Sequence, residues 1–419
     1  MDHDFGFFLE EKDQDEKAAN LRRAHLALVQ GNHREALHLA EEILEHSPLD
    51  VDALNLAAAA SFNLDELSVA AVLFRKVLLY DPDNAGAHHN YGILLERQGK
   101  LNEAVTHFQR CIQLQPDFPE SYIHLGNILE NLRQEKEAAD FYRQALQRLP
   151  EGGENYFQRG YLLNRLGEFE QALENFQRSI AAHCQEAASY NGLGYVLSAL
   201  YRDAEALVNF NRAIALHPED ASFHFNRGLS LLRLKNYREG IESFICALEL
   251  SAPLWGAVME NVRLLIEKAP PDAVQELLDQ AEKVRSGSPE IPFFRALLLL
   301  EEGHPEEALS GLEESLKRNP GSIQVLHLKG TVLRQLKRYD AALDCFDTIL
   351  GRAGDIPLAH YGRAAVLALQ GRTGDAIAAL TAASQKDRQL LDRAWEDSAF
   401  DPIRQDPAFL RLIRARNVS

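Results

Sequence analysis

The sequence has few of the residues that form covalent frameworks and metal sites. Only four of its 419 residues are cysteines, with no C-x-x-C pair among them: Cys111, Cys184, Cys246 and Cys345. Because the cysteines are few and far apart, we expect neither a disulfide framework nor a zinc site. The 15 histidines include no H-E-x-x-H motif, so they do not indicate a metal either. We expect no cofactor and a reducing location, the cytoplasm.

Long apolar runs and excess basic charge are also absent. The apolar stretch from Phe5 to Leu9 is too short for a signal peptide or a membrane helix, and no later stretch is long enough to insert in a membrane. The 44 Lys and Arg residues stand against 62 Asp and Glu residues, a formal net charge of −18. Because nucleic acids and anionic membranes attract clustered cations, we expect neither as a partner.

Motifs of catalysis are missing as well. Neither G-x-x-x-x-G-K-[ST] nor G-x-S-x-G occurs, and no strand is predicted that could carry a dinucleotide-binding turn. The sequence therefore predicts that the protein is not an enzyme and has no catalytic residues.

What the sequence does contain is a repeat of 34 residues, without insertion or deletion, over eleven units. Ten of the eleven residues at position 8 are Gly or Ala: Ala24, Ala58, Gly92, Gly126, Gly160, Gly194, Gly228, Val262, Ala296, Gly330 and Ala364. A second small residue follows twelve positions later, at position 20, for example Ala104 and Ala138. A fixed period in this range is typical of a solenoid.

One repeat, residues 85–118, shows the physical reason for the pattern. Helices are predicted over 85–98 and 102–115, with Gly99 closing the first and Pro116 ending the second. Asp117 is predicted to cap the next helix. Small residues at positions 8 and 20 would let the two helices cross closely, against a large residue at position 24 such as Phe108.

The order of Tyr or His at position 4, Gly at 8, Ala at 20, Phe at 24 and Pro at 32 resembles the tetratricopeptide repeat (TPR) family over residues 17–390. The resemblance implies an all-α fold, a right-handed α-solenoid of about eleven helix-turn-helix repeats. Position 4 departs from the family pattern, since it holds no Trp.

The regularity of the repeats varies along the chain. Residues 1–16 form an acidic segment that either is flexible or caps the first repeat, and residues 17–254 form seven regular repeats. Repeats 8 and 9, residues 255–322, have lost parts of the pattern, and residues 323–390 return to it. Two explanations stay open for 255–322: drift that leaves the helices stacked with altered packing, or a kink between two arrays.

The C-terminal segment, residues 391–419, is predicted to close the last open hydrophobic face, as solenoids require. Its covering residues would be Trp395, Phe400, Ile403, Phe409 and Leu412. Two Asp-Pro pairs, at 401–402 and 406–407, each predict a helix cap followed by a first helical residue. The segment resembles the end-of-group cap of many bacterial TPR arrays.

The resemblance implies that the first helices line a concave groove through positions 2, 5, 6, 9, 12 and 13. We predict a peptide-binding groove there over repeats 3 to 7. Its candidate residues are amides, aromatics, His and Arg: His89, Asn90, Arg97, His124, Asn127, Asn131, Phe157, Gln158, Tyr161, Arg165, Asn191, Tyr195, Phe225, Asn226 and Arg233.

Amides can hold the backbone of an extended peptide, aromatics can anchor it, and Arg can pair with its carboxylates. A purely structural interpretation is also open. Phe157 and Phe225 would then fill space between helices, and the Arg residues would interact favourably with helix C-termini. The chaperone-binding clamp of some TPR proteins is not expected, because position 5 holds no Lys in the first seven repeats.

The leading hypothesis is a non-enzymatic, cytoplasmic scaffold or adaptor that binds a peptide or helix of a partner protein in this groove. The alternative is a structural protein that self-assembles into homo-oligomers. Nucleic-acid binding is the third hypothesis, which the negative charge disfavours. The sequence identifies neither the partner nor the pathway nor the oligomeric state.

Overall fold

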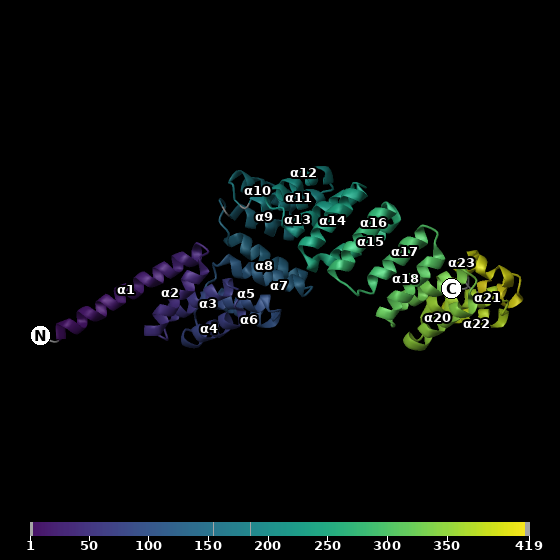
Figure 1. Cartoon of the computed structure of the whole chain (residues 1–419), viewed down its shortest axis with the longest axis horizontal. Coiled ribbons are helices and arrows are strands. Elements are labelled where there is room, and N and C mark those ends of the chain that lie inside the picture. Colours follow the sequence, from purple (N-terminus) through teal and green to yellow (C-terminus); the bar gives the residue numbers. More distant parts are fainter. Residues whose placement is uncertain (1–2, 154, 185, 415–419) are drawn as a thin grey trace. The chain divides into compact units, whose positions relative to one another are not determined.

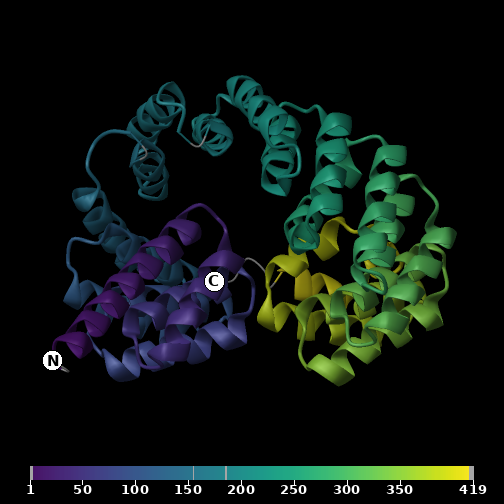
Figure 2. The ribbon, with the colours of Figure 1, turned by 60° about the vertical axis from the view of Figure 1, so that its left-hand side comes forward.

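The computed structural model describes the backbone of residues 3–153, 155–184 and 186–414, and the side chains of these residues from Glu16 onward. In these ranges the chain forms 24 α-helices and two 3₁₀-helices, without a strand. Helices that follow one another pair as antiparallel hairpins, for example α5 with α6, α7 with α8 and α13 with α14 (Figures 1 and 2). The predicted all-α solenoid is confirmed.

The chain divides into two compact units, Met1–Leu200 (unit 1) and Tyr201–Ser419 (unit 2). The division falls inside the sixth repeat, at a place that the sequence pattern does not mark. The helices of unit 1 are α1 (His3–Val29), α2 (His33–His46), α3 (Val51–Asn63), α4 (Leu67–Tyr80), α5 (Ala85–Arg97), α6 (Leu101–Leu114), α7 (Pro119–Asn131), α8 (Glu135–Arg148), α9 (Asn155–Arg165), α10 (Phe169–Ala181) and α11 (Glu186–Ala199).

Unit 2 contains the remaining repeats and the C-terminal segment. Its helices are α12 (Asp203–Leu216), α13 (Ala221–Arg233), α14 (Tyr237–Leu250), η1 (Ala252–Leu254), α15 (Trp255–Lys268), α16 (Pro271–Val284), α17 (Glu290–Glu301), α18 (Pro305–Arg318), α19 (Ile323–Gln335), α20 (Tyr339–Ala353), α21 (Pro357–Leu369), α22 (Thr373–Lys386), α23 (Gln389–Glu396), η2 (Ser398–Ile403) and α24 (Pro407–Arg414).

The hairpins agree with the periodic pattern to within about one residue, as α5 and α6 show. The acidic segment is continuous with the first repeat, since α1 begins at His3. Residues 1–2 lie outside the described residues, as do the side chains of residues 3–15. Whether this segment caps the first repeat therefore stays a prediction.

The turn between the two helices of a repeat is left-handed at position 15. Ten of the eleven residues there have positive φ, and five of these are not glycine: Asp65, Arg133, Tyr201, Lys235 and Lys337. The exception is Ala269, which is extended with φ −93° because Pro270 follows it and disfavours helical backbone.

The predicted cap at Asp117 is wrong by one residue. The N-cap of α7 is Phe118, which has no side-chain acceptor, and Pro119 follows it. In other repeats the same position 34 holds Asp50, Asn84 and Ser322, whose side chains accept a hydrogen bond from the backbone N–H three residues on. The cap therefore belongs to position 34, immediately before the helix.

The small residue at position 8 lies against the aromatic ring at position 24 of its own repeat. A Cβ atom built on Gly92 would lie 2.8 Å from the Phe108 ring, and one on Gly228 would lie 2.7 Å from the Phe244 ring. Both rings are fully buried. The predicted packing of small against large residues is what brings the two helices of a repeat together.

This contact predicts opposite effects for two glycine substitutions. Gly92→Ala should lower the free energy of unfolding by about 1 kcal/mol, because overpacking costs about 1–3 kcal/mol and the helix propensity of alanine returns part of it. Gly256→Ala, in α15, meets no atom within 4 Å and should instead raise it by about 0.5–1 kcal/mol. Urea denaturation of both variants checks this, and equal signs would contradict the packing argument.

Repeat 8 is held together differently. Val262 and Val274 occupy its two small positions and are fully buried. As a result, α15 and α16 approach less closely than the helices of the other hairpins in unit 2, and α16 packs mainly against α14. The helices of repeat 8 thus remain packed although valines replace the small residues at positions 8 and 20. This packing does not test whether the chain bends over 255–322, so the kink stays a prediction.

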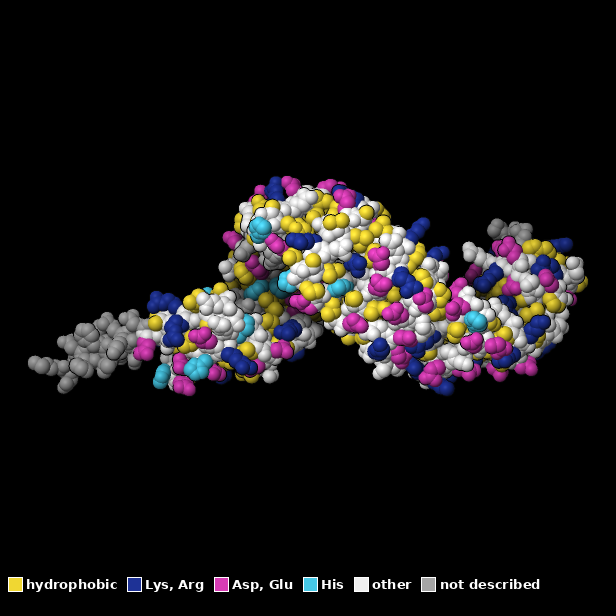
Figure 3. All heavy atoms as spheres, turned by 45° about the horizontal axis from the view of Figure 1, so that its top comes forward, with side chains coloured by type: hydrophobic (Ala, Val, Ile, Leu, Met, Phe, Trp, Pro, Cys, Tyr) yellow, Lys and Arg dark blue, Asp and Glu magenta, His cyan; other side chains and the backbone are white. Residues whose placement is uncertain are grey.

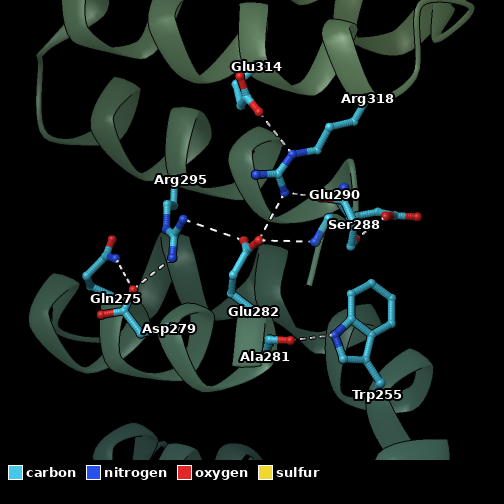
Figure 4. Close-up of polar contacts among 11 residues, drawn as sticks. Trp255, Gln275, Asp279, Ala281, Glu282, Ser288, Glu290, Arg295, Glu314 and Arg318 are labelled. Carbon is cyan, nitrogen blue, oxygen red and sulfur yellow. Dashed lines mark hydrogen bonds and ion pairs between the residues drawn. The ribbon is translucent and has the colours of Figure 1, made fainter. Parts of the chain in front are cut away.

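A polar cluster joins α16 to the next repeat (Figure 4). The Glu282 carboxylate accepts a hydrogen bond of 3.1 Å from Arg318, and it lies 3.6 Å from the Arg295 guanidinium. Arg318 also donates to the Ser288 carbonyl at 2.8 Å. The Trp255 indole donates to the Ala281 carbonyl at 3.2 Å. These contacts connect the divergent repeats where the sequence pattern is weakest.

The C-terminal helices pack on the last repeat. Phe400, Ile403 and Phe409 are buried against α21 and α22, and Leu412 is partly buried there. Trp395 instead remains partly exposed below the Arg404 guanidinium. The first Asp-Pro pair does not start a helix, because Pro402 lies inside η2, which Asp397 caps. The second pair does, since Asp406 caps α24.

Candidate functional site

The fifteen candidate groove residues are divided between the two units. Twelve lie in unit 1, on helices α5, α7, α9 and α11, and Phe225, Asn226 and Arg233 lie in unit 2 on α13. We call the unit 1 set the first-helix face. Of its members only His89 is buried; the others are partly or largely exposed.

Asn127 is the centre of a hydrogen-bond network on this face. Its side-chain oxygen accepts a bond of 3.0 Å from the Tyr161 hydroxyl of the next repeat. The Tyr142 hydroxyl lies 2.8 Å from both this oxygen and a Glu130 carboxylate oxygen. Arg165 forms an ion pair with Glu130. The Tyr161 and Arg165 contacts join α9 to α7 of the preceding repeat, whereas the Tyr142 bonds lie within repeat 4.

The tyrosines of the network stay protonated. Burial raises the pKa of Tyr142 well above its usual value, and the hydrogen bond to Glu130 raises it further. Burial also raises the pKa of Tyr161, which the positive charge of Arg165 partly offsets. Both hydroxyls are therefore hydrogen-bond donors at neutral pH and not bases. The arrangement suits binding more than proton transfer.

A second group of contacts surrounds His89. Its Nδ1 lies 2.9 Å from the Ser121 hydroxyl, and its ring meets the rings of Phe108, Phe118 and His124. Burial, followed by the charge of His124, lowers the pKa of His89 to about 4. The ring is therefore neutral at physiological pH and offers little surface to a partner.

Charged candidates on this face pair with the preceding repeat. His124 Nδ1 lies 2.8 Å from a Glu96 carboxylate oxygen, and Arg97 lies 3.1 Å from Asp65. The Arg97–Asp65 pair is exposed, and such a pair contributes only about 0–1 kcal/mol, so its formation does not remove Arg97 from a ligand; His124 and Glu96 are partly buried.

The remaining candidates differ in whether their side chains interact with other residues of the chain. The side chains of Asn90, Asn131 and Gln158 form no hydrogen bond with another described residue, and Tyr195 is 48% exposed. Asn191 does interact with a neighbour. Phe157 packs on Phe176, with ring centroids 5.9 Å apart. The free amides and Tyr195 thus have their full bonding capacity available to a ligand.

In unit 2 the three candidates have internal contacts. The Phe225 ring packs on Phe244, with centroids 5.6 Å apart, and Arg233 lies 3.4 Å from Asp203. Asn226 also interacts with a neighbour. The space-filling interpretation of Phe157 and Phe225 therefore has direct support, although neither ring is fully buried.

Sequence reasoning missed the acceptors of these networks. Glu96 and Glu130 stand at position 12, which the groove pattern includes, but they are not among the candidate residues. Tyr142 replaces the Phe usual at position 24, and only its extra hydroxyl signals a buried polar partner. Ser121 has no comparable signal.

The surface carries mixed charge. Figure 3 shows acidic and basic side chains interspersed over one face, without a large area of either sign. Among the described residues, no helix combines the length and apolar character needed to cross a bilayer.

Comparison with known families assigns four parts of the chain to helical-repeat models. Residues 53–158 match the middle TPR-like domain of cilia and flagella-associated protein 70. Tetratricopeptide repeat models match residues 200–245 and 327–389, and residues 153–182. No curated protein matches the chain in sequence.

Three solved structures are similar to parts or most of the chain. YrrB, described as a TPR protein with an unusual peptide-binding site, is 23% identical with a TM-score of 0.32, covering 43% of this chain and 93% of its own. Pseudomonas aeruginosa pilF is 20% identical with a TM-score of 0.43, covering 53% and 98%. Yeast Tom70 is 16% identical with a TM-score of 0.39, covering 96% and 99%.

These structural likenesses are too distant to carry an inference about function. The family matches, however, agree with the residue pattern, the helical hairpins and the close contact between positions 8 and 24. TPR folds are in general modules of protein–protein interaction. The chain belongs to the tetratricopeptide repeat family.

Proposed function

We propose that the protein is a non-enzymatic, cytoplasmic scaffold or adaptor that binds a peptide or helix of a partner protein on the first-helix face of unit 1. The observation that carries this proposal is the row of unengaged polar side chains beside a rigid network. Asn90 and Gln158 keep their donors and acceptors free, while Asn127 is held by Tyr142 and Tyr161.

Such an arrangement suits an extended peptide. A side-chain amide has a donor and an acceptor and can therefore pair with both groups of a peptide unit. The exposed Tyr195 ring can supply apolar contact area at a low cost in conformational entropy. Because Asn127 and Glu130 already bond to residues of the next repeat, these contacts favour a site that is formed before a ligand binds.

The experiment replaces two amides that form no hydrogen bond with a described residue and one exposed tyrosine. The triple variant Asn90→Ala, Gln158→Ala, Tyr195→Ala should weaken capture of a partner peptide at least tenfold, about 1.4 kcal/mol or more. The partner would be captured from a lysate by the wild-type chain, identified by mass spectrometry, and its binding segment measured by fluorescence anisotropy.

A matched control changes exposed amides elsewhere. The control variant is Gln109→Ala, Gln177→Ala. Both glutamines are exposed, on the second helices α6 and α10, so this variant should leave the affinity for the peptide unchanged. Equal binding by the triple variant, with its helicity intact by circular dichroism, would remove the proposed site.

A further inference from the structure

Two histidine side chains meet between the helices of repeat 3. His88 stands at position 4 of this repeat, on α5, and His107 stands at position 23, on α6. Their Nδ1 atoms are 2.9 Å apart, and both side chains are partly exposed. Because 19 residues separate the two histidines along the chain, the sequence contains no short metal-binding motif at this place.

The fold accounts for one ring nitrogen of His88 and leaves the other free for a second contact. Its Nε2 donates a hydrogen bond of 3.0 Å to the Pro82 carbonyl, which can only accept. Position 4 has the same contact in the next repeat, where the Tyr122 hydroxyl donates to the Pro116 carbonyl at 2.9 Å. This bond keeps the proton of neutral His88 on Nε2, so Nδ1 carries a lone pair.

His107 has no counterpart in the other repeats. At position 23 they hold Leu, Phe, Asn, Ser, Gly, Cys or Ala, and never His. The hairpin therefore forms without a histidine at this position. The Tyr91 ring, three residues after His88 on α5, packs edge to face on the His107 ring, with centroids 4.8 Å apart, and so helps to keep it beside His88.

The distance and the outer contact of this pair are those of a metal site. Imidazole nitrogen suits Ni²⁺ and Cu²⁺, and metal–imidazole bonds are about 2.0–2.1 Å long. Two such nitrogens at right angles around one ion lie about 2.9 Å apart, whereas the tetrahedral coordination of Zn²⁺ requires about 3.3 Å. The observed separation of the Nδ1 atoms is 2.9 Å. A metal-bound histidine usually donates its other N–H to a carbonyl or carboxylate, as His88 does to Pro82.

The rest of the coordination sphere is open. As the side chains stand, the described part of the chain has no group of three His, Cys, Asp or Glu that could hold a metal ion. Glu103 is exposed four residues before His107, on the same side of α6, where its charge favours a cation. The pair therefore supplies two nitrogen ligands, and water fills the remaining positions.

We propose that His88 and His107 bind a divalent transition-metal ion that favours square-planar or octahedral coordination, Ni²⁺ or Cu²⁺. In the free chain the His107 Nδ1–H donates to His88 Nδ1. The ion takes the place of this proton, which moves through water to His107 Nε2, and the two rings turn until both lone pairs point at the ion. The ion then joins α5 to α6. This site is independent of the partner site proposed on the first-helix face.

Isothermal titration calorimetry of the full-length chain with Ni²⁺ near neutral pH tests the proposal. The wild type should bind one Ni²⁺ more tightly than any further ions. His107→Asn and His88→Tyr should each raise the dissociation constant of this site at least about tenfold. Both changes install residues that other repeats carry at these positions, and Tyr keeps a donor for the Pro82 carbonyl, so the hairpin should still fold.

A matched control separates this pair from the other histidines. His224 also stands at position 4, with Nε2 2.8 Å from the Pro218 carbonyl, but Ser243 stands where a second histidine would be needed. His224→Tyr should therefore bind Ni²⁺ as the wild type does. Mg²⁺, which favours oxygen ligands, should not bind at the pair.

A stability measurement tests whether the ion joins the two helices. Excess Ni²⁺ should raise the midpoint of urea denaturation of the wild type but not of His107→Asn, because an ion held only by the folded hairpin stabilises it. Three results would overturn the proposal. These are equal Ni²⁺ affinities of the wild type and His107→Asn, a loss in His224→Tyr as large as in His88→Tyr, and a wild-type urea midpoint that Ni²⁺ leaves unchanged.

Discussion

Phe346→Ala is expected to lower the free energy of unfolding of the chain by about 4 kcal/mol, the usual cost of truncating a buried phenylalanine. Phe346 is 1% exposed, and a Cβ atom on Gly330 would lie 2.9 Å from its ring. Gly362 of the next repeat contacts the other side of the same ring. The lost side chain would therefore leave a cavity between two repeats, which rigid helices cannot close.

Urea denaturation followed by circular dichroism measures this change, and hydrogen exchange locates it. Protection should fall most in α19, α20 and α21, because a repeat protein is held by nearest-neighbour contacts. Val208→Ala, at a position that is 69% exposed in the same unit, should change the free energy of unfolding by less than about 0.5 kcal/mol. Similar losses in the two variants would contradict the role given to the position 24 ring.

Acidification from pH 7 to 4 is expected to destabilise unit 1 through His89. Burial and the His124 charge lower its pKa to about 4 in the folded chain from 6.5. Between these values the unfolded chain binds a proton that the folded chain does not, so stability falls as the pH falls. The shift corresponds to a loss of about 3 kcal/mol over this interval.

The comparison that isolates His89 uses His89→Gln. Its free energy of unfolding should fall less steeply between pH 6.5 and 4 than that of the wild type, although other groups titrate in both. His38→Gln removes an exposed histidine of α2 and should follow the wild-type profile. Parallel profiles for wild type and His89→Gln, or a histidine NMR titration without a pKa near 4, would show that His89 is not the responsible group.

Most of the fold could be predicted because its constraints are local. A hairpin needs a small residue at position 8, an aromatic at position 24 and a turn at position 15, all within 34 residues. Gly92 and Phe108 satisfy this requirement, and their contact is as close as the pattern predicts. The error at Asp117 concerns only the cap: the first helices begin at position 1 in this repeat as in others, and the N-cap is the residue immediately before it, Phe118.

The candidate site was less predictable. The sequence selected candidate residues on the first helices, but it could not tell which of their side chains form hydrogen bonds within the chain. Asn127 is bound by two tyrosines, whereas Asn90 forms no hydrogen bond with a described residue, although both are partly buried amides on first helices. Asn127, at position 9, lies within reach of the Tyr142 hydroxyl of its own repeat and of the Tyr161 hydroxyl of the next, and Gly126 leaves room beside the Tyr142 ring; Asn90 stands at position 6.

The order of amino acids alone specifies the helices, their hairpins and the packing within a repeat, because these depend on residues near one another along the chain. The tertiary structure decides what lies between repeats. It places α16 against α14 after Val262 and Val274 replace the small pair, and it joins Glu130 to Arg165 across two first helices. Such contacts depend on the separation and offset of stacked helices, to which many side chains contribute together.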